Sequence, residues 1–520
     1  MSDPIDTSPQ GQSPGQPPAG GAKGIGSKAV KASVWVMGGV VFTRLANLAM
    51  TVVLARILLP QDFGLVALAT TVLLMLQAIT DLSLGNALIH KQDASRADYD
   101  TAFTLGVLRG LLLMVVMIGA GAVMVKVYGD PRLFAIMAAI SVRPLMSGLM
   151  SPYYITLAKH LKFSVVIAIE SLAAVVQLVA AVAVAWTTHS YWGIVAGVIA
   201  AGFVPLVASF LYAPYRPRFS LASSKLILGF SIWVTLNQFI TVIGNRFDNL
   251  VIGAVLGTAT FGAYNVGNNI ATMLTQQAIQ PLERVFFPSF VHIAADRDRL
   301  RAAFQRSQSS LFAVGLPLGV GLALVAEPLV ALALGPKWHL AAVVIQLIAP
   351  VLGVQVVFGA VNAVAYAQGA TKDLFQRSLW QTAVRVPVVL AGLFFWGLTG
   401  LLVARILSGG VLLSVLNLML VRKLTGLTAF EQVKVTWRSL VSTVVMVAAA
   451  LAVRSLFPSV EHHADALYAT VAISAVGGLA YVATHAAVWF MAGRPGNSIE
   501  AELARLLSKT TGRFARLRSA

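Results

Sequence analysis

The chain has no cysteine, and only 11% of its residues are charged. The absence of cysteine excludes disulfides, thiol catalysis and thiolate metal sites. Soluble domains carry roughly 25% charged residues. A chain that is 58% hydrophobic and so poor in charge is therefore expected to be solvated largely by lipid. Its eight histidines show no His-Glu-x-x-His spacing, which argues against a metal site.

Acidic residues are scarcer than basic ones, and the formal net charge is +18. Such an excess can indicate nucleic-acid binding. Here, however, the basic residues lie in short loops between apolar runs rather than on one polar domain. The positive-inside rule explains this distribution better, because the cytoplasmic loops of membrane proteins are rich in Lys and Arg. No nucleic-acid partner is expected.

Apolar segments of about 20 residues, the length that crosses a bilayer, follow one another along most of the chain. With the N-terminus inside, the outer loops contain only four basic residues: Arg56, Lys126, Arg132 and Lys337. This asymmetry predicts that both termini are cytoplasmic. The fourteen predicted spans are 33–54, 63–86, 102–125, 133–151, 164–187, 192–211, 226–256, 261–290, 303–334, 338–369, 378–397, 399–421, 440–457 and 466–491.

The sequence from Ser33 to Gly64 recurs in similar form 198 residues later, as an internal repeat (the internal echo). A fixed-period echo in a hydrophobic chain indicates two similar halves, a common plan for transporters. Six predicted helices separate the copies, an even number, so both enter the membrane from the same side and the repeat is parallel. The matching pairs include Trp35 with Trp233, Asn47 with Asn245, and Phe63-Gly64 with Phe261-Gly262.

These patterns divide the chain into five parts. The first residues are rich in Pro, Gly, Ser and Gln and cannot bury a core, which predicts disorder. At the other end, leucines recur near helical spacing among basic residues, which predicts an amphipathic helix on the inner leaflet; a frayed basic tail is the alternative. The parts are 1–28, a disordered tail; 29–215 and 216–425, two six-helix lobes; 426–491, an extra helix pair; and 492–520, a basic cytoplasmic tail.

Arginine is the commonest charged residue within the apolar spans. An unpaired charge at the bilayer centre costs at least about 2.5–3.5 kcal/mol, so each should face water or a partner. Arg284 and Arg405 lie near helix ends, where the side chain can snorkel to the interface. For any single arginine, an ion pair that fixes helix packing is the alternative. The arginines in spans are Arg44, Arg109, Arg143, Arg246, Arg284, Arg385, Arg405 and Arg454.

Acids in or beside the spans are fewer than arginines, so the deep charges predict an electropositive cavity that suits an anion. Arg44, Arg143 and Arg246 are predicted to face it together, because guanidinium forks match phosphate oxygens. Glu170 could carry a coupling proton or cation, but the arginine excess favours a counter-charge for Arg44 or Arg143. The predicted substrate-binding residues are Arg44, Asn47, Arg143, Arg246, Asn237, Gln238 and Arg385, and the coupling or counter-charge residues are Glu170, Asp248 and Asp81.

Several motifs resemble one family. Arg44-Leu45-Ala46-Asn47 and the run from Leu54 to Gly64 resemble the opening of bacterial polysaccharide transporters of the Wzx type. That family shares a superfamily with multidrug antiporters and lipid II flippases. The resemblance extends from about residue 33 to 425. Further resembling motifs follow in the family's order at Asp81–Ala87, Asp248–Gly253, Phe261–Tyr264 and Gly335–Trp338.

The resemblance implies an all-α integral membrane protein of the bacterial inner membrane, with two parallel six-helix lobes around a central cavity and a C-terminal helix pair. It implies a flippase, not an enzyme, that moves undecaprenyl-diphosphate-linked oligosaccharides by alternating access for lipopolysaccharide or exopolysaccharide biosynthesis. Expected partners are this lipid-linked substrate, membrane lipid, a coupling H⁺ or Na⁺ and polysaccharide polymerase machinery. No cofactor is implied.

Two alternatives stay open. A cation-coupled multidrug antiporter of the same superfamily predicts a cavity dominated by acidic residues, whereas this sequence is richer in arginine. A membrane polymerase or ligase predicts a sizeable outer loop with acid/base residues, but only Pro458–Asp465 clusters Glu and His.

Overall fold

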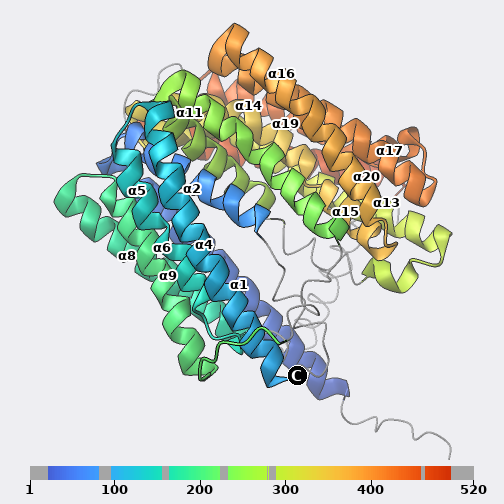
Figure 1. Cartoon of the computed structure of the whole chain (residues 1–520). Helices are drawn as coiled ribbons and strands as arrows, with labels where there is room; N and C mark the ends of the chain where they lie inside the picture. The colour runs from blue at the N-terminus through green and yellow to red at the C-terminus, as the bar shows by residue number, and fades with distance from the viewer. Residues whose placement is uncertain are drawn as a thin grey trace, which may run out of the picture.

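The computed structural model describes residues 22–80, 95–154, 163–222, 232–277, 279, 289–457 and 463–493. All regular elements in these ranges are helices, and they form two lobes that diverge from a shared contact (Figure 1). The N-terminal lobe contains α1 (Ala22–Ile57), α2 (Pro60–Ile79), α4 (Arg96–Tyr128), α5 (Arg132–Ile140), α6 (Val142–Gly148), α8 (Phe163–Thr188) and α9 (Trp192–Tyr212).

The C-terminal lobe is followed by an additional helix pair. The lobe contains α11 (Ile232–Leu274), α13 (Arg297–Ala333), α14 (His339–Gln355), α15 (Phe358–Ala367), α16 (Thr371–Arg405) and α17 (Leu413–Thr425), with a short 3₁₀ turn (Pro336–Trp338) before α14 and a π-helical turn (Ile406–Leu412) before α17. After the short α18 (Ala429–Lys434), the pair α19 (Trp437–Arg454) and α20 (His463–Met491) packs on α13.

Eleven helices in the described part are long and apolar enough to cross a membrane, fewer than the fourteen predicted spans. Two of them contain a fold-back at a glycine with positive φ, Gly257 (82°) in α11 and Gly397 (61°) in α16. Glycine adopts this conformation without steric penalty. The predicted span 133–151 is instead broken at Ser141 into α5 and α6. Helical segments therefore occupy the described parts of all the predicted spans, and the all-α, two-lobe prediction is confirmed.

The internal echo marks the contact between the lobes. A Cβ on Gly64 would lie 1.9 Å from the carbonyl oxygen of Thr258, and one on Gly262 would lie 1.8 Å from that of Pro60. These contacts are images of each other under the 198-residue offset, as expected where related helices cross on a two-fold axis. The side chains of Trp35 and Trp233 lie outside the described part, and the predicted domain boundaries remain predictions.

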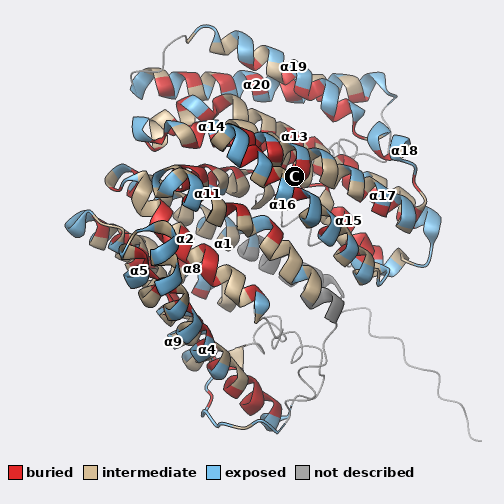
Figure 2. Ribbon diagram, turned by 45° about the horizontal axis from the view of Figure 1, so that its top comes forward, coloured by how far each residue is buried: buried red, intermediate tan, exposed pale blue. Residues whose placement is uncertain are grey.

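The main core lies at this contact, which we call the closed end of the molecule. Leu65, Ile136, Phe261 and Trp338 are each 0% exposed there, so both lobes contribute to one apolar cluster (Figure 2). The turns between α1 and α2 and between α13 and α14, both predicted to be outside, meet at the closed end, where Lys337 donates to the carbonyl oxygens of Arg56 and Leu58. The orientation of the crossings stays a prediction.

Exposed aromatic residues are consistent with a lipid environment. Trp380 and Trp396 lie on the first part of α16 and are 65% and 73% exposed. Their spacing of 16 residues corresponds to about 24 Å of helix. Trp is enriched at both membrane–water interfaces, and the hydrocarbon layer between them is about 30 Å thick. This helix is thus suited to cross the membrane with an aromatic anchor near each end.

Candidate functional site

A cavity of about 670 Å³ lies between the lobes, lined by residues of α1, α11 and α14–α17. The charged residues that line it, within the described ranges, are all arginines: Arg44, Arg246, Arg377, Arg385 and Arg405. The remaining polar lining is dominated by side-chain amides, which both donate and accept hydrogen bonds. These amides are Asn47, Asn245, Asn249, Asn268, Asn269, Asn362, Asn417, Gln276, Gln277, Gln355 and Gln381.

Two of the arginines share one buried acid. Asp248, on α11, is 1% exposed, and its Oδ2 lies 2.9 Å from Nη2 of Arg385 and 3.7 Å from Nε of Arg405. Arg385 also donates to Oδ1 of Asn245 at 2.9 Å. Because two cations share a single carboxylate, this cluster keeps a net positive charge.

The fold-back at Gly257 completes this cluster, because it brings Tyr264 back beside Asp248. The Tyr264 hydroxyl donates to Oδ2 of Asp248 at 3.3 Å and accepts a hydrogen bond from Arg405. The Arg405 guanidinium also lies 5.6 Å from the centre of the Tyr264 ring, and it donates to Oδ1 of Asn268 at 2.9 Å. We call Asp248, Tyr264, Arg385 and Arg405 the paired cluster. Its arginines are held before any ligand arrives.

Arg44 and Arg246 differ from the paired cluster. Both are half-buried and line the cavity, yet neither makes a hydrogen bond or an ion pair with a residue in the described ranges. Arg44 comes from α1 of the N-terminal lobe, whereas Arg246 comes from the first half of α11. These two guanidinium groups are therefore free to bind an anion with their full set of donors.

Arg377 forms a third arrangement. It lies on α16 two turns before Arg385, and Nη1 donates to Oδ1 of Asn362 at 3.0 Å and of Asn417 at 2.8 Å. Its buried Nε has no hydrogen-bond partner in the described part. Arg377, Gln381 and Arg385 recur every four residues and so line the cavity from one face of α16.

Residues 53–344, more than half of the chain, match the family described as "Polysaccharide biosynthesis protein". The chain belongs to this family. It is 24% identical over 374 residues to the lipopolysaccharide biosynthesis protein WzxC of Escherichia coli K12, an alignment that covers 70% of this chain and 75% of WzxC. It is 25% identical over 300 residues to the succinoglycan biosynthesis transport protein ExoT of Rhizobium meliloti, covering 57% of this chain and 60% of ExoT.

Solved structures agree on the fold of this family member. The lipid II flippase MurJ in an inward closed conformation superposes with a TM-score of 0.67 at 13% identity, covering 89% of this chain and 100% of that one. An inward-facing multidrug resistance MATE transporter of the MOP superfamily gives 0.59 at 14% identity, covering 76% and 98%. The relatives and neighbours are thus biosynthesis and transport proteins, in agreement with a transporter rather than an enzyme.

The structure brings together part of the predicted site. Arg44, Asn47, Arg246 and Arg385 all line the cavity, and Asp248 lies directly behind it, bound to Arg385. Asn237 and Gln238 lie on α11 but do not line the cavity. Asp81, Arg284 and residues 494–520 of the predicted tail lie outside the described part of the structure.

Arg143 is the main correction. It was predicted to share the cavity with Arg44 and Arg246, but it lies on α6, its side chain is exposed, and it does not line the cavity. The break at Ser141 explains the difference, because α6 packs on α4 and α9 within the N-terminal lobe. Glu170 is exposed on α8, and among described residues it makes no ion pair with Arg44 or Arg143.

A further expectation about an arginine is wrong. Arg405 was expected to snorkel from a helix end, but it faces the cavity and belongs to the paired cluster, because the fold-back at Gly397 returns it toward α11. Arg377, which is not among the predicted site residues, also lines the cavity from α16. The four-residue spacing between Arg377, Gln381 and Arg385 is the sequence signal that could have revealed it.

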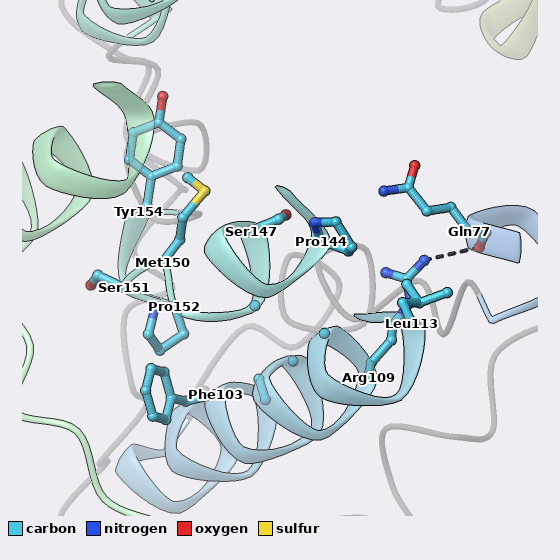
Figure 3. A pocket seen from close by; sticks show the side chains of 14 residues that line it. Gln77, Phe103, Arg109, Leu113, Pro144, Ser147, Met150, Ser151, Pro152 and Tyr154 are labelled. Atoms are coloured by element: carbon cyan, nitrogen blue, oxygen red, sulfur yellow. Dashed lines mark hydrogen bonds between the residues drawn. The ribbon is translucent and has the colours of Figure 1, made fainter. Parts of the chain in front are cut away.

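Arg109 lies in a separate, smaller pocket of about 270 Å³ within the N-terminal lobe, between α2, α4 and α6 (Figure 3). Its Nη2 donates to the carbonyl oxygen of Gln77 at 2.9 Å, and its Nε donates to Oγ1 of Thr80 at 3.1 Å. Arg109 therefore caps the C-terminal end of α2, where carbonyl groups lack helical partners. The positive charge of Arg109 therefore stabilises the end of this helix.

Proposed function

We propose that the protein is a flippase that moves undecaprenyl-diphosphate-linked oligosaccharides outward across the bacterial inner membrane by alternating access. The cavity between the lobes is the observation that carries this proposal: its charged lining is arginine and the rest of its polar lining is largely amide. A diphosphate requires the first property and a glycan requires the second. The family supports the same assignment, since WzxC is named for lipopolysaccharide biosynthesis and ExoT for succinoglycan transport.

The diphosphate is assigned to Arg44 and Arg246. These two arginines have no partner among the described residues, so they can direct all their donors at a ligand. A guanidinium binds phosphate oxygens in a bidentate manner through shorter, stronger hydrogen bonds than neutral groups make. Arg44 lies on α1 of the N-terminal lobe and Arg246 on α11 of the C-terminal lobe. A diphosphate bound to both arginines would therefore connect the two lobes.

The glycan is assigned to the amide-rich wall. Sugar hydroxyls donate and accept hydrogen bonds, and side-chain amides can satisfy both roles. Asn268 and Asn269 lie on the second half of α11 and Gln276 lies just after its end, while Asn362 and Asn417 line the same cavity from α15 and α17. The apolar polyprenyl chain would remain in lipid between the diverging lobes, since its transfer into this polar cavity would be unfavourable.

The cavity argues against the antiporter alternative. A site for cationic drugs would need uncompensated acid, but Asp248 already binds two arginines. For the same reason Asp248 is a poor ligand for a coupling H⁺ or Na⁺. We retain ion coupling and a polymerase partner as parts of the proposal, with cytoplasmic termini as the loop charges predict.

Flipping by purified protein in vesicles tests the assignment. A fluorescent undecaprenyl-diphosphate-linked oligosaccharide is supplied in one leaflet, and its appearance in the other is followed with a membrane-impermeant quencher. The variant Arg44→Ala/Arg246→Ala should lose flipping, whereas Arg143→Ala, an intramembrane arginine outside the cavity, should keep it. Wild-type flipping by the double variant would refute the cationic site.

A further inference from the structure

Two loops meet at the closed end, one from each lobe. The first joins α1 to α2, and the second joins α13 to the turn that precedes α14. Lys337 of the second loop donates through Nζ to the carbonyl oxygens of Leu58 at 2.7 Å and Arg56 at 3.2 Å. Arg56 in turn donates through Nε to the carbonyl oxygen of Ala333 at 2.9 Å, and through Nη2 to that of Leu332.

These hydrogen bonds cap helix ends reciprocally. The last carbonyl groups of a helix have no partner within it and carry partial negative charge, so cations near them are stabilising. Arg56 of the N-terminal lobe caps the end of α13, while Lys337 of the C-terminal lobe caps the end of α1. Each cap therefore comes from the opposite lobe, and separation of the lobes here uncaps both helices at once.

Buried packing reinforces the caps. Trp338 is 0% exposed, its Nε1 donates to the carbonyl oxygen of Ala55 at 2.9 Å, and its ring meets the Phe63 ring edge-on at 5.1 Å. The backbone contact at Gly64 and Gly262 also joins the two lobes at this end. Unlike that symmetric contact, Arg56 and Lys337 do not correspond under the 198-residue offset, so the caps are an addition to the repeat.

We propose that Arg56, Lys337 and Trp338 form a reciprocal latch that holds the cavity shut at the closed end and must release before the cavity opens there. The latch rests on the proposed transport cycle, in which the lobes separate at this end. A change between two such states is governed by the differential free energy of contacts present in only one of them. The latch contacts join the lobes and so belong to the closed state alone.

Single-cysteine labelling can test the latch, because the chain has no cysteine of its own. Thr51→Cys places a thiol in the cavity, on α1 beyond the latch. Its reaction with a membrane-impermeant maleimide added at the closed-end side should be slow in the parent. Arg56→Gln/Lys337→Gln should accelerate it by about 5- to 30-fold, the effect of one or two kcal/mol on a population. Trp338→Phe, which keeps an aromatic ring at this position but loses the Nε1 donor, should give a smaller increase.

Matched controls separate the latch from charge and folding effects. Lys126→Gln removes a basic residue of the same end that makes no hydrogen bond or ion pair with the other lobe among described residues, and labelling should stay slow. Lys337→Arg retains a cationic donor and should also stay slow. Thermal unfolding curves establish that the parent and the Arg56→Gln/Lys337→Gln variant are both folded. Equal labelling rates for these two folded proteins would overturn the proposal.

A second thiol tests the orientation independently. Ser455→Cys, exposed at the closed-end terminus of α19, should react with the reagent added outside intact cells. If Ser455→Cys reacts only from inside, the orientation in the proposed function is wrong. The Thr51→Cys experiment is then run with the reagent on that side, where it decides the latch in the same way.

Discussion

Two pairs of arginines in the cavity are held differently. Arg385 and Arg405 belong to the paired cluster, in which buried Asp248 and Tyr264 fix their positions. Arg44 and Arg246 face the same cavity without a partner among the described residues. A preorganised arginine needs no reorganisation on binding, but its donors are partly used. An unpaired arginine keeps all its hydrogen-bond donors available, and these must be satisfied by solvent or by the ligand. The paired cluster should therefore control stability, and the unpaired arginines should control binding.

The largest expected effect is the loss of Asp248. Asp248→Ala leaves Arg385 and Arg405 without a counter-charge in a buried site, which should destabilise the protein by about 3–5 kcal/mol. Equilibrium or thermal unfolding in detergent measures this change. Asp130→Ala is the control, because its partner Arg132 is 41% exposed at the start of α5, and such a pair contributes only about 0–1 kcal/mol. Equal destabilisation by both variants would remove the distinction between the two groups.

The unpaired arginines should show the opposite pattern. Charge-assisted hydrogen bonds contribute about 1.5–3 kcal/mol each, so Arg44→Ala should weaken binding of undecaprenyl diphosphate by about 10- to 150-fold. Arg44→Lys should recover only part of this loss, because an ammonium lacks the bidentate fork. Titration of the ligand against purified protein measures both. Unfolding of Arg44→Ala should match wild type, and a large loss of stability would show that Arg44 also has a structural partner.

The smallest effect concerns an acid that binds a neutral partner. Tyr215 lies after the end of α9, and its hydroxyl donates to Oδ1 of Asp100, near the start of α4, at 2.5 Å. Burial, and next this hydrogen bond, raise the pKa of Tyr215 to about 12. Between pH 10 and 12 the unfolded tyrosine ionises while the folded one stays neutral, so stability should fall as pH rises. Tyr215→Phe should flatten this fall in unfolding measurements, and an unchanged slope would exclude Tyr215 as its source.

Several features of the site could be predicted because they depend on composition and depth. Arg44, Arg246 and Arg385 were predicted to face a cavity because a charge deep in a bilayer requires water or a partner. Arg143 satisfied the same argument, yet it lies outside the cavity. Depth alone does not specify the direction in which a side chain points. That direction depends on the rotation of each helix about its axis, and Ser141 changes it for α6.

The sequence by itself determined the lipid environment and the two-lobe plan, because these follow from the length of the apolar runs and from the internal repeat. Only the tertiary structure decided that Arg377 and Arg405 join the cavity, that Asp248 is shared, and that the lobes cap each other's helices. The spans are apolar on nearly all faces, and lipid is as apolar as a helix interface. Hydrophobic periodicity therefore carries little information on which helix faces pack together. That information came only from the contacts between distant segments in the tertiary structure.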